Sequence, residues 1–164
     1  MWCVVYAGDK NEQKTKSFIT HLLRGNARAR CFSLTKNRLY KNSGVWHTVC
    51  ERIFPGYVFI DTDEPEAVYR ILEKTPKNLL FSDSSKVCVL DKDEEMLLNS
   101  IVDENGQIGI SDVHIREDKT IEFLSGPLVK MPERVKKVDL HRRFAEVQMN
   151  LPYGKESVWL GIRF

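Results

Sequence analysis

The stretch Glu51–Asp61 reads ERIFPGYVFID and predicts the centre of the fold. Residues 57–60 are apolar and β-prone, so we expect them to form a buried strand. The pair Pro55–Gly56 stands at the start of this strand, because proline lacks a backbone donor and is normally kept to strand ends or edges. Two large aromatic residues, Phe54 and Tyr57, flank the pair. Two interpretations stay open: the rings are ordinary core, or they are rigid contact area for a partner.

The composition is that of a water-soluble globular protein. The chain has 164 residues, of which 42% are hydrophobic and 29% charged, and this suits one medium domain or two small ones. It lacks the ~20 consecutive apolar residues that a membrane helix needs and an amino-terminal signal. We therefore expect a cytoplasmic, monomeric protein with no membrane partner.

The pattern of reactive side chains predicts a binding protein rather than an enzyme. The histidines show no metal-ligand spacing, no Ser-His-Asp or Cys-His group can be argued, and the glycines are dispersed at turns. We expect no catalytic residue, no metal and no cofactor. The four cysteines are far apart, without a CxxC pair, and are expected to be reduced core thiols. They are Cys3, Cys31, Cys50 and Cys88.

Positive charge is concentrated in two segments, although the formal net charge is only +2. Residues 10–41 hold nine Lys or Arg against one acidic residue, and residues 130–143 hold six against two. Charge runs are usually solvated faces. Two basic segments in separate parts of the chain nevertheless favour a polyanionic partner.

Three helices are predicted by one local device, a capping oxygen followed three residues later by an acidic side chain. Each such pair precedes apolar residues at helical spacing. The pairs are Asp9 with Glu12, Asp63 with Glu66, and Asp91 with Glu94.

Strands are predicted between these helices. Residues 2–6 and 86–90 read as strands, and residues 31–61 read as a hairpin with a polar tip at 42–44 that extends into a meander. The order βα-βββ-α-β-α over residues 1–104 predicts an α+β domain, one sheet with helices packed on it.

The character of the chain changes after residue 104. The Gly-containing residues 105–111 are expected to form a linker. Beyond them, apolar and polar residues alternate with period two, which together with turn signals predicts a small β-barrel at residues 112–164. The alternating apolar residues include Ala145, Val147, Met149, Val158, Leu160 and Ile162.

Several motifs resemble the NusG family of transcription elongation factors. They are WCVVY at residues 2–6, FPGYVFI at 54–60, and FLSGPL followed by VKKVD at 123–139. The resemblance spans nearly the whole chain. It implies an amino-terminal NusG domain at 1–104, a linker at 105–111 and a carboxy-terminal KOW domain, an SH3-like β-barrel, at 112–164.

The sequence departs from the general NusG pattern in its KOW motif. After Gly126 and Pro127, the places of two further glycines hold Lys130 and Glu133. This change, and the segment VDLHRRFAEVQM, are closer to the specialised NusG paralogues of the RfaH, UpxY and LoaP groups, and above all to LoaP-type antiterminators.

The resemblance implies a transcription regulator that binds RNA polymerase and promotes processive antitermination of specific operons, recruited by a hairpin in the nascent RNA. One alternative is a general NusG factor that couples polymerase to Rho or to the ribosomal small subunit, to which Tyr153, placed before Gly154, would dock. A second alternative is a ribosome-associated KOW protein.

The resemblance also implies three sets of contact residues. The clamp of RNA polymerase would be bound by Trp2, Phe54, Pro55 and Tyr57. RNA would be bound by Lys130, Arg134, Lys136, Lys137, His141, Arg142, Arg143 and Trp159. A basic hairpin near polymerase and upstream or non-template DNA would present Arg28, Arg30, Lys36, Arg38 and Lys41.

Overall fold

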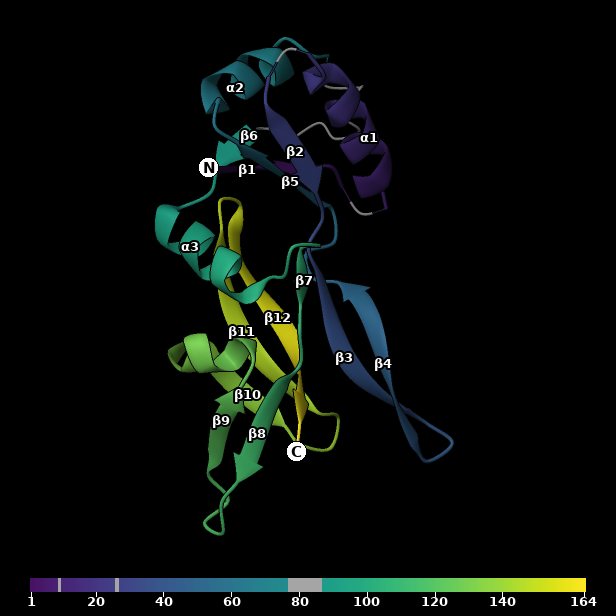
Figure 1. Ribbon diagram of the computed structural model, residues 1–164, viewed down its shortest axis with the longest axis vertical. Helices are drawn as coiled ribbons and strands as arrows, with labels where there is room; N and C mark the ends of the chain where they lie inside the picture. The colour runs from purple at the N-terminus through teal and green to yellow at the C-terminus, as the bar shows by residue number, and fades with distance from the viewer. Residues whose placement is uncertain (9, 26, 77–86) are drawn as a thin grey trace. The chain divides into compact units, whose positions relative to one another are not determined.

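The computed structural model describes residues 1–8, 10–25, 27–76 and 87–164. These residues form two compact units (Figure 1). The amino-terminal unit contains Met1–Ser33 and Phe54–Glu95, and the carboxy-terminal unit contains Leu34–Ile53 and Met96–Phe164. A mid-chain segment therefore belongs to the carboxy-terminal unit. The domain boundaries predicted from the sequence, at residues 104 and 112, concern which fragments fold independently, and they stay predictions.

The amino-terminal unit is a four-stranded antiparallel sheet with the order β2-β5-β1-β6. Its strands are β1 (Trp2–Tyr6), β2 (Ala29–Phe32), β5 (Tyr57–Thr62) and β6 (Val87–Val89). Its helices are α1 (Glu12–Leu23), α2 (Pro65–Glu73) and the first residues of α3 (Lys92–Ile101). The strands predicted at 2–6 and 57–60 are confirmed. The strand predicted at 86–90 is present as β6, with Lys86 outside the described residues.

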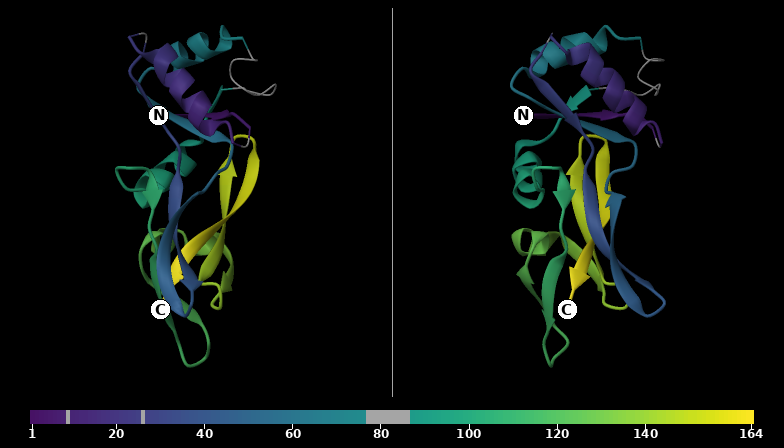
Figure 2. Two further views of the ribbon diagram at one scale, coloured as in Figure 1. Left: turned by 90° about the vertical axis from the view of Figure 1, so that its right-hand side faces the viewer. Right: turned by 45° about the vertical axis from the view of Figure 1, so that its right-hand side comes forward.

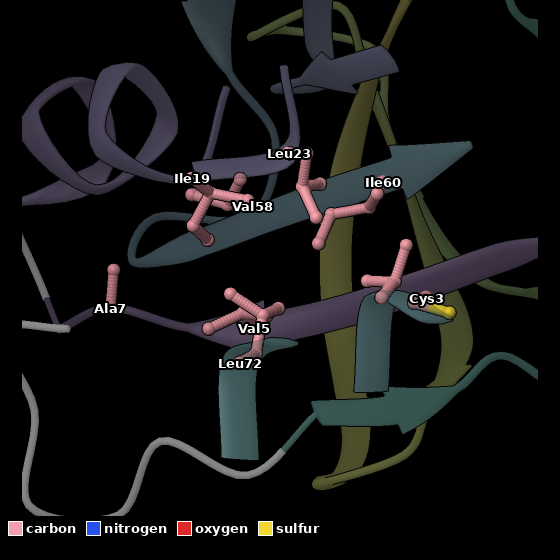
Figure 3. Packing of buried hydrophobic residues seen from close by; sticks show 9 residues of the cluster. Cys3, Val5, Ala7, Ile19, Leu23, Val58, Ile60 and Leu72 are labelled. Atoms are coloured by element: carbon pink, nitrogen blue, oxygen red, sulfur yellow. The ribbon is translucent and has the colours of Figure 1, made fainter. Parts of the chain in front are cut away.

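Helices α1 and α2 cover one face of this sheet (Figures 1 and 2). Alternate residues of β1 and β5 meet the apolar faces of both helices (Figure 3). The buried cluster consists of Cys3, Val5, Ala7, Ile19, Leu23, Val58, Ile60, Val68 and Leu72. Removing this apolar area from water is the main favourable contribution to the stability of the unit.

The predicted capping pairs have different outcomes. At α3 the prediction is confirmed for Asp91, whose Oδ1 accepts the Asp93 N–H at 2.9 Å. At α1 the N-cap is Asn11, which makes no side-chain capping bond, and the buried Glu12 accepts the Gly56 N–H at 2.6 Å; Asp9 lies outside the described residues. At α2 the residue at the cap is Glu64, which makes no side-chain capping bond.

The carboxy-terminal unit contains two sheets, with the orders β4-β3-β7 and β10-β11-β12-β8-β9. The first is built from β3 (Thr35–Asn42), β4 (Val45–Arg52) and β7 (Gln107–Ile108). The second is built from β8 (Ser111–Ile115), β9 (Ile121–Ser125), β10 (Val135–Asp139), β11 (Phe144–Leu151) and β12 (Gly154–Arg163). Two 3₁₀ helices, η2 (Pro127–Lys130) and η3 (Pro132–Arg134), precede β10.

The predicted single sheet for residues 1–104 is therefore wrong. The β3–β4 hairpin has its predicted tip, but it pairs with β7 rather than with β2 or β5. The reason is its side chains, which are mostly polar or charged and cannot be buried on both faces as β1 and β5 are. The predicted linker is also more ordered than expected, because β7 lies within it and Ile108 is fully buried.

The alternation predicted for the last strands is confirmed. Residues 145, 147 and 149 of β11 and residues 158, 160 and 162 of β12 are buried. Asp112 ties β8 to β12 and β9, since its carboxylate accepts from Arg163 Nε and from Ser125 Oγ, both at 2.7 Å. The Arg163 hydrogen bond, followed by that of Ser125, lowers the pKa of Asp112. The closed SH3-like form of this sheet stays a prediction.

Gly56 explains the Pro-Gly pair before β5. Its φ of +88° lies in the left-handed region, and a Cβ at this position would come within 2.6 Å of a Tyr6 ring atom. Its carbonyl accepts the Ala7 N–H at 2.6 Å while its own N–H donates to Glu12. Only glycine satisfies both the backbone angle and the close approach.

We predict that Gly56→Ala destabilises the protein more than Gly44→Ala does. Gly44 also has a positive φ, +83°, but a Cβ there meets no atom within 4 Å. Both changes cost about 1–2 kcal/mol of left-handed strain, and the Tyr6 clash adds roughly 1–3 kcal/mol at Gly56 alone. Urea unfolding of the two variants measures the difference; equal losses would contradict the steric role of Tyr6.

Candidate functional site

The face of the amino-terminal sheet opposite to α1 and α2 carries a cluster of aromatic rings. Trp2 meets Phe32 and Phe59 edge-on, with ring centroids 4.8 and 6.0 Å apart. Phe54 lies 5.9 Å from Phe59 and 6.2 Å from Tyr57. We call these five residues the aromatic cluster. It gathers three of the four residues predicted to bind the polymerase clamp.

The aromatic cluster is buried. The exposed fractions of Trp2, Phe54 and Tyr57 are 4%, 5% and 6%, whereas Pro55 beside them is exposed. Burial by itself fits both interpretations that the sequence leaves open, core residues and partner contacts. A partner contact through them stays a proposal.

The basic hairpin set predicted from the sequence is divided between the two units. Arg28 and Arg30 belong to the amino-terminal unit, where the Arg30 guanidinium lies 5.4 Å from the Phe32 ring centre. Lys36, Arg38 and Lys41 lie on β3 in the carboxy-terminal unit. The prediction of one basic hairpin is thus wrong for Arg28 and Arg30, because the chain changes sheets between β2 and β3.

Strand β3 packs directly on β12 (Figure 2). Gly161 permits this approach, since a Cβ there would lie 2.7 Å from the Asn37 carbonyl oxygen and 3.0 Å from the Arg38 Cα. Lys36 Nζ crosses the junction and donates to the Trp159 carbonyl oxygen at 2.6 Å. The hairpin is therefore part of the carboxy-terminal unit through backbone proximity as well as through side chains.

Arg143 joins the turn before β11 to the hairpin. Its guanidinium carbon lies 4.2 Å from the Trp46 ring centre and 4.6 Å from that of Phe164. Lys41 Nζ also lies 5.6 Å from the Trp46 ring. Cations over aromatic faces are attracted by the ring quadrupole. Arg143, predicted to bind RNA, thus lies within cation–π distance of two rings.

The other predicted RNA-binding residues are spread over several elements. Lys136 and Lys137 on β10, and His141 and Arg142 in the following turn, are exposed. Lys130, at the end of η2, donates to the Ser100 carbonyl oxygen. Arg134 and Trp159 are half-buried.

The hairpin and the five-stranded sheet line an open cleft of about 510 Å³. We call it the hairpin cleft. Its lining combines cations from both basic segments with two carboxylates and two aromatic rings. The lining residues are Lys36, Arg38, Glu51, Asp139, Arg142, Phe144 and Trp159.

The side chains of the hairpin cleft are held by contacts with one another. Arg38 Nε donates to Glu51 Oε1 at 2.6 Å, and its guanidinium lies 5.8 Å from the Phe144 ring centre. Phe144 meets Trp159 edge-on at 6.0 Å. These contacts restrict the rotamers of the lining, which lowers the entropy cost of binding a ligand.

Burial shifts the pKa of Lys36 in this cleft. Desolvation lowers the pKa of Lys36, the carboxylate of Glu51 acts in the opposite direction, and Arg38 lowers it further. An anionic or hydrogen-bond-accepting ligand beside Lys36 would favour its charged form.

Neither thiols nor metal ligands form a further site in the part of the chain that the structure describes. No group of three or more His, Cys, Asp or Glu residues there is arranged to hold a metal ion. The four cysteines are free thiols, and burial raises the pKa of Cys3 and Cys31. The α-helices within the described ranges lack the length and apolar character needed to cross a bilayer.

Three residues of the hairpin cleft were missed by sequence reasoning: Glu51, Asp139 and Phe144. They come from three strands and carry no local motif. The only feature of the sequence that they share is that each stands near basic residues. Many other residues do so too, and this feature therefore could not have identified them as part of a site.

Fold and surface together define a small α+β protein with a buried aromatic sheet face and a basic, partly aromatic cleft. The chain matches no protein-family model, and no curated protein matches it. Among solved structures it is similar to one described as "Domain interaction in Thermotoga maritima NusG". That similarity has 17% sequence identity, covers 98% of this chain and 92% of that chain, and has a TM-score of 0.45. At this level it assigns neither a family nor a function.

We predict that Arg143→Ala loosens the β3–β4 hairpin whereas Arg142→Ala does not. Arg143 has a φ of +58°, and alanine carries the same backbone strain, so the change removes chiefly the stack on Trp46 and Phe164. Losing about 0.5–2 kcal/mol of cation–π attraction should speed amide hydrogen exchange in the hairpin by about twofold to thirtyfold. Unchanged exchange in Arg143→Ala would show that the stack does not hold the hairpin.

Proposed function

We propose that this protein is a transcription elongation regulator of the specialised NusG type. It binds RNA polymerase through the sheet face that carries the aromatic cluster. The observation that carries the proposal is the convergence of Trp2 with the FPGYV residues Phe54 and Tyr57 on one sheet face. Large rigid rings are favoured anchors of protein interfaces.

The proposal places a requirement on this sheet face. Because Trp2, Phe54 and Tyr57 are buried, binding must uncover them, with the exposed Pro55 at their edge available for a first contact. Uncovering the rings exposes their apolar area to water, which costs free energy. Burying the same area against the partner then offsets that cost.

Antitermination is the activity we propose for the bound state. The protein acts without catalysis or cofactor, as a monomer in the cytoplasm, by holding polymerase in a processive form on specific operons. The exposed cations Lys136, Lys137, His141 and Arg142 support recruitment by a nascent RNA hairpin, since each phosphate contact adds salt-dependent affinity. A regular A-form major groove is closed to side chains, so recognition would fall on the loop or on a bulge.

The polymerase contact is tested by comparing Tyr57→Ala with Ile60→Ala. Both residues lie on β5, and both changes create a core cavity that costs about 2–5 kcal/mol. Ile60, however, faces the helices. Per folded molecule, Tyr57→Ala should weaken binding to RNA polymerase by about tenfold or more, and Ile60→Ala should leave it unchanged. Pull-down with purified polymerase, corrected for the folded fraction by circular dichroism, measures this. Equal losses of polymerase binding in the two variants would show that Tyr57 acts only as a core residue.

Transcription in vitro tests the proposed activity. With polymerase, this protein and a template that carries its own operon leader, readthrough of an intrinsic terminator should rise several-fold. Replacing the leader by a scrambled sequence should abolish the rise, because recruitment would be lost. A rise that does not depend on the leader would contradict the specialised role.

A general NusG role remains the second candidate because of Tyr153. This residue is exposed at the turn between β11 and β12, directly before Gly154. An exposed aromatic at a tight turn is suited to dock on a protein such as Rho or a ribosomal small-subunit protein. Loss of Rho-dependent effects in Tyr153→Ala would favour this candidate.

A further inference from the structure

The hairpin cleft brings together two basic segments that lie about a hundred residues apart in the sequence. Lys36 and Arg38 come from β3, and Arg142 comes from the turn before β11. Asp139 and Trp159 stand among these cations. A site that binds only backbone phosphates uses cations. It needs neither a carboxylate nor an aromatic ring, because neither group attracts a phosphate.

We propose that the hairpin cleft binds one guanine nucleotide of single-stranded RNA. The base lies against the Trp159 and Phe144 rings, its Watson–Crick edge meets Asp139 and Lys36, and its phosphate meets Arg142. The choice of RNA rests on the proposed function, whereas the choice of guanine rests on the cleft itself.

The aromatic lining supplies a surface for the base. Trp159 is half-buried, so part of its ring is accessible, and the Phe144 ring fixes its orientation from the side. Stacking on such a ring is favourable for any base, because every base has a π-face. The rings therefore account for binding but not for base preference.

The charged lining supplies the preference. A guanine presents one acceptor, O6, next to two donors, N1–H and N2–H, whereas each of the other bases presents at most one donor position on this edge. A cation beside a carboxylate matches O6 and N1–H of guanine, as it would match O4 and N3–H of uracil, and only guanine offers a second donor, N2–H, to the carboxylate. Lys36 has three donor hydrogens and uses one on the Trp159 carbonyl. Asp139 Oδ1 accepts the Arg142 backbone N–H at 2.8 Å, which leaves acceptor capacity on the carboxylate.

Two further residues adjust this arrangement. Glu51 is paired with Arg38 at 2.6 Å, so it does not compete with Asp139 for the base. Arg142 is exposed, which places its guanidinium in reach of a phosphate at the surface.

The size of the cleft favours single-stranded RNA over a duplex. A volume of about 510 Å³ is within the range of small-ligand sites. It admits an unstacked base, but the width of a double helix lies far beyond it. Splayed bases are available in single strands and in hairpin loops, which are the usual targets of sequence-specific RNA recognition.

The test uses the full chain and three fluorescein-labelled RNA octamers. Each consists of adenine except for one central position, which is guanine, inosine (guanine without the N2 amine) or adenine. Fluorescence anisotropy at fixed salt should show the guanine octamer bound about tenfold more tightly than the adenine octamer, with inosine between them.

Matched variants separate base reading from charge. Asp139→Asn should abolish the preference for guanine, whereas Asp118→Asn, which makes the same charge change at an exposed turn outside the cleft, should keep it. Arg142→Ala should weaken all three octamers more than Lys155→Ala does. Trp159→Leu should weaken all three and Trp159→Phe should rescue most of the loss, which guards against a variant that fails to fold.

Equal affinity of the unchanged protein for the three octamers overturns the proposal, as does tighter binding of a duplex DNA of equal length. Retention of the guanine preference in a folded Asp139→Asn variant overturns the assignment of the base-reading residue. Binding to RNA polymerase is measured on the same proteins. Its absence in the unchanged protein would count against the proposed function, while the octamer result would still decide the cleft.

Discussion

Strand β5 is buried on both faces, and this constraint organises the amino-terminal unit. Its alternate residues serve two different layers: Val58 and Ile60 pack on α1 and α2, while Tyr57 and Phe59 belong to the aromatic cluster. Polar side chains occur in this strand only where they are exposed, as Asp61 is, or hydrogen-bonded, as the buried Thr62 is to the Arg28 carbonyl oxygen, because an unpaired buried polar group costs several kcal/mol. The chain must also enter the strand tightly, and Gly56 provides the left-handed turn against Tyr6.

The carboxy-terminal unit solves the opposite problem, that of a strand pair too polar to be buried. The β3–β4 hairpin has few apolar side chains, so its attachment depends on local contacts with β12 and the turn before β11. Gly161 removes the side chain that would keep the backbones apart, and the Arg143 guanidinium lies 4.2 Å from the Trp46 ring centre and 4.6 Å from that of Phe164. Neighbouring arginines thereby have different roles, since Arg142 stays exposed while Arg143 is stacked.

The same charges that attach the hairpin give the hairpin cleft its chemistry. Lys36 is brought into a partly desolvated position by the approach of β3 to β12, and burial lowers its pKa there. Arg38 is oriented by Glu51 and by the Phe144 ring. In a partly desolvated site each hydrogen bond to a charged group is worth more than at the surface. The side chains that attach the hairpin are therefore among those that line the hairpin cleft.

Local features of the sequence determined most elements of the fold. Apolar runs predicted β1 and β5, period-two alternation predicted β11 and β12, and the turn residues at 42–44 predicted the hairpin tip, because these signals depend on neighbours along the chain. Caps were less predictable: α1 begins after Asn11 rather than after Asp9, and its first residue, Glu12, accepts a hydrogen bond from Gly56 in a distant segment of the chain.

Tertiary structure alone decided which sheet receives the hairpin, and hence how the basic residues are grouped. Nothing local in residues 28–41 shows that Arg30 and Lys36 lie in different units, and nothing near residue 139 shows that Asp139 faces the same cleft as Lys36. Those groupings depend on close approaches between strands far apart in the sequence, such as that of Asn37 and Gly161. Such an approach is set by the packing of whole strands, which no single stretch of residues encodes.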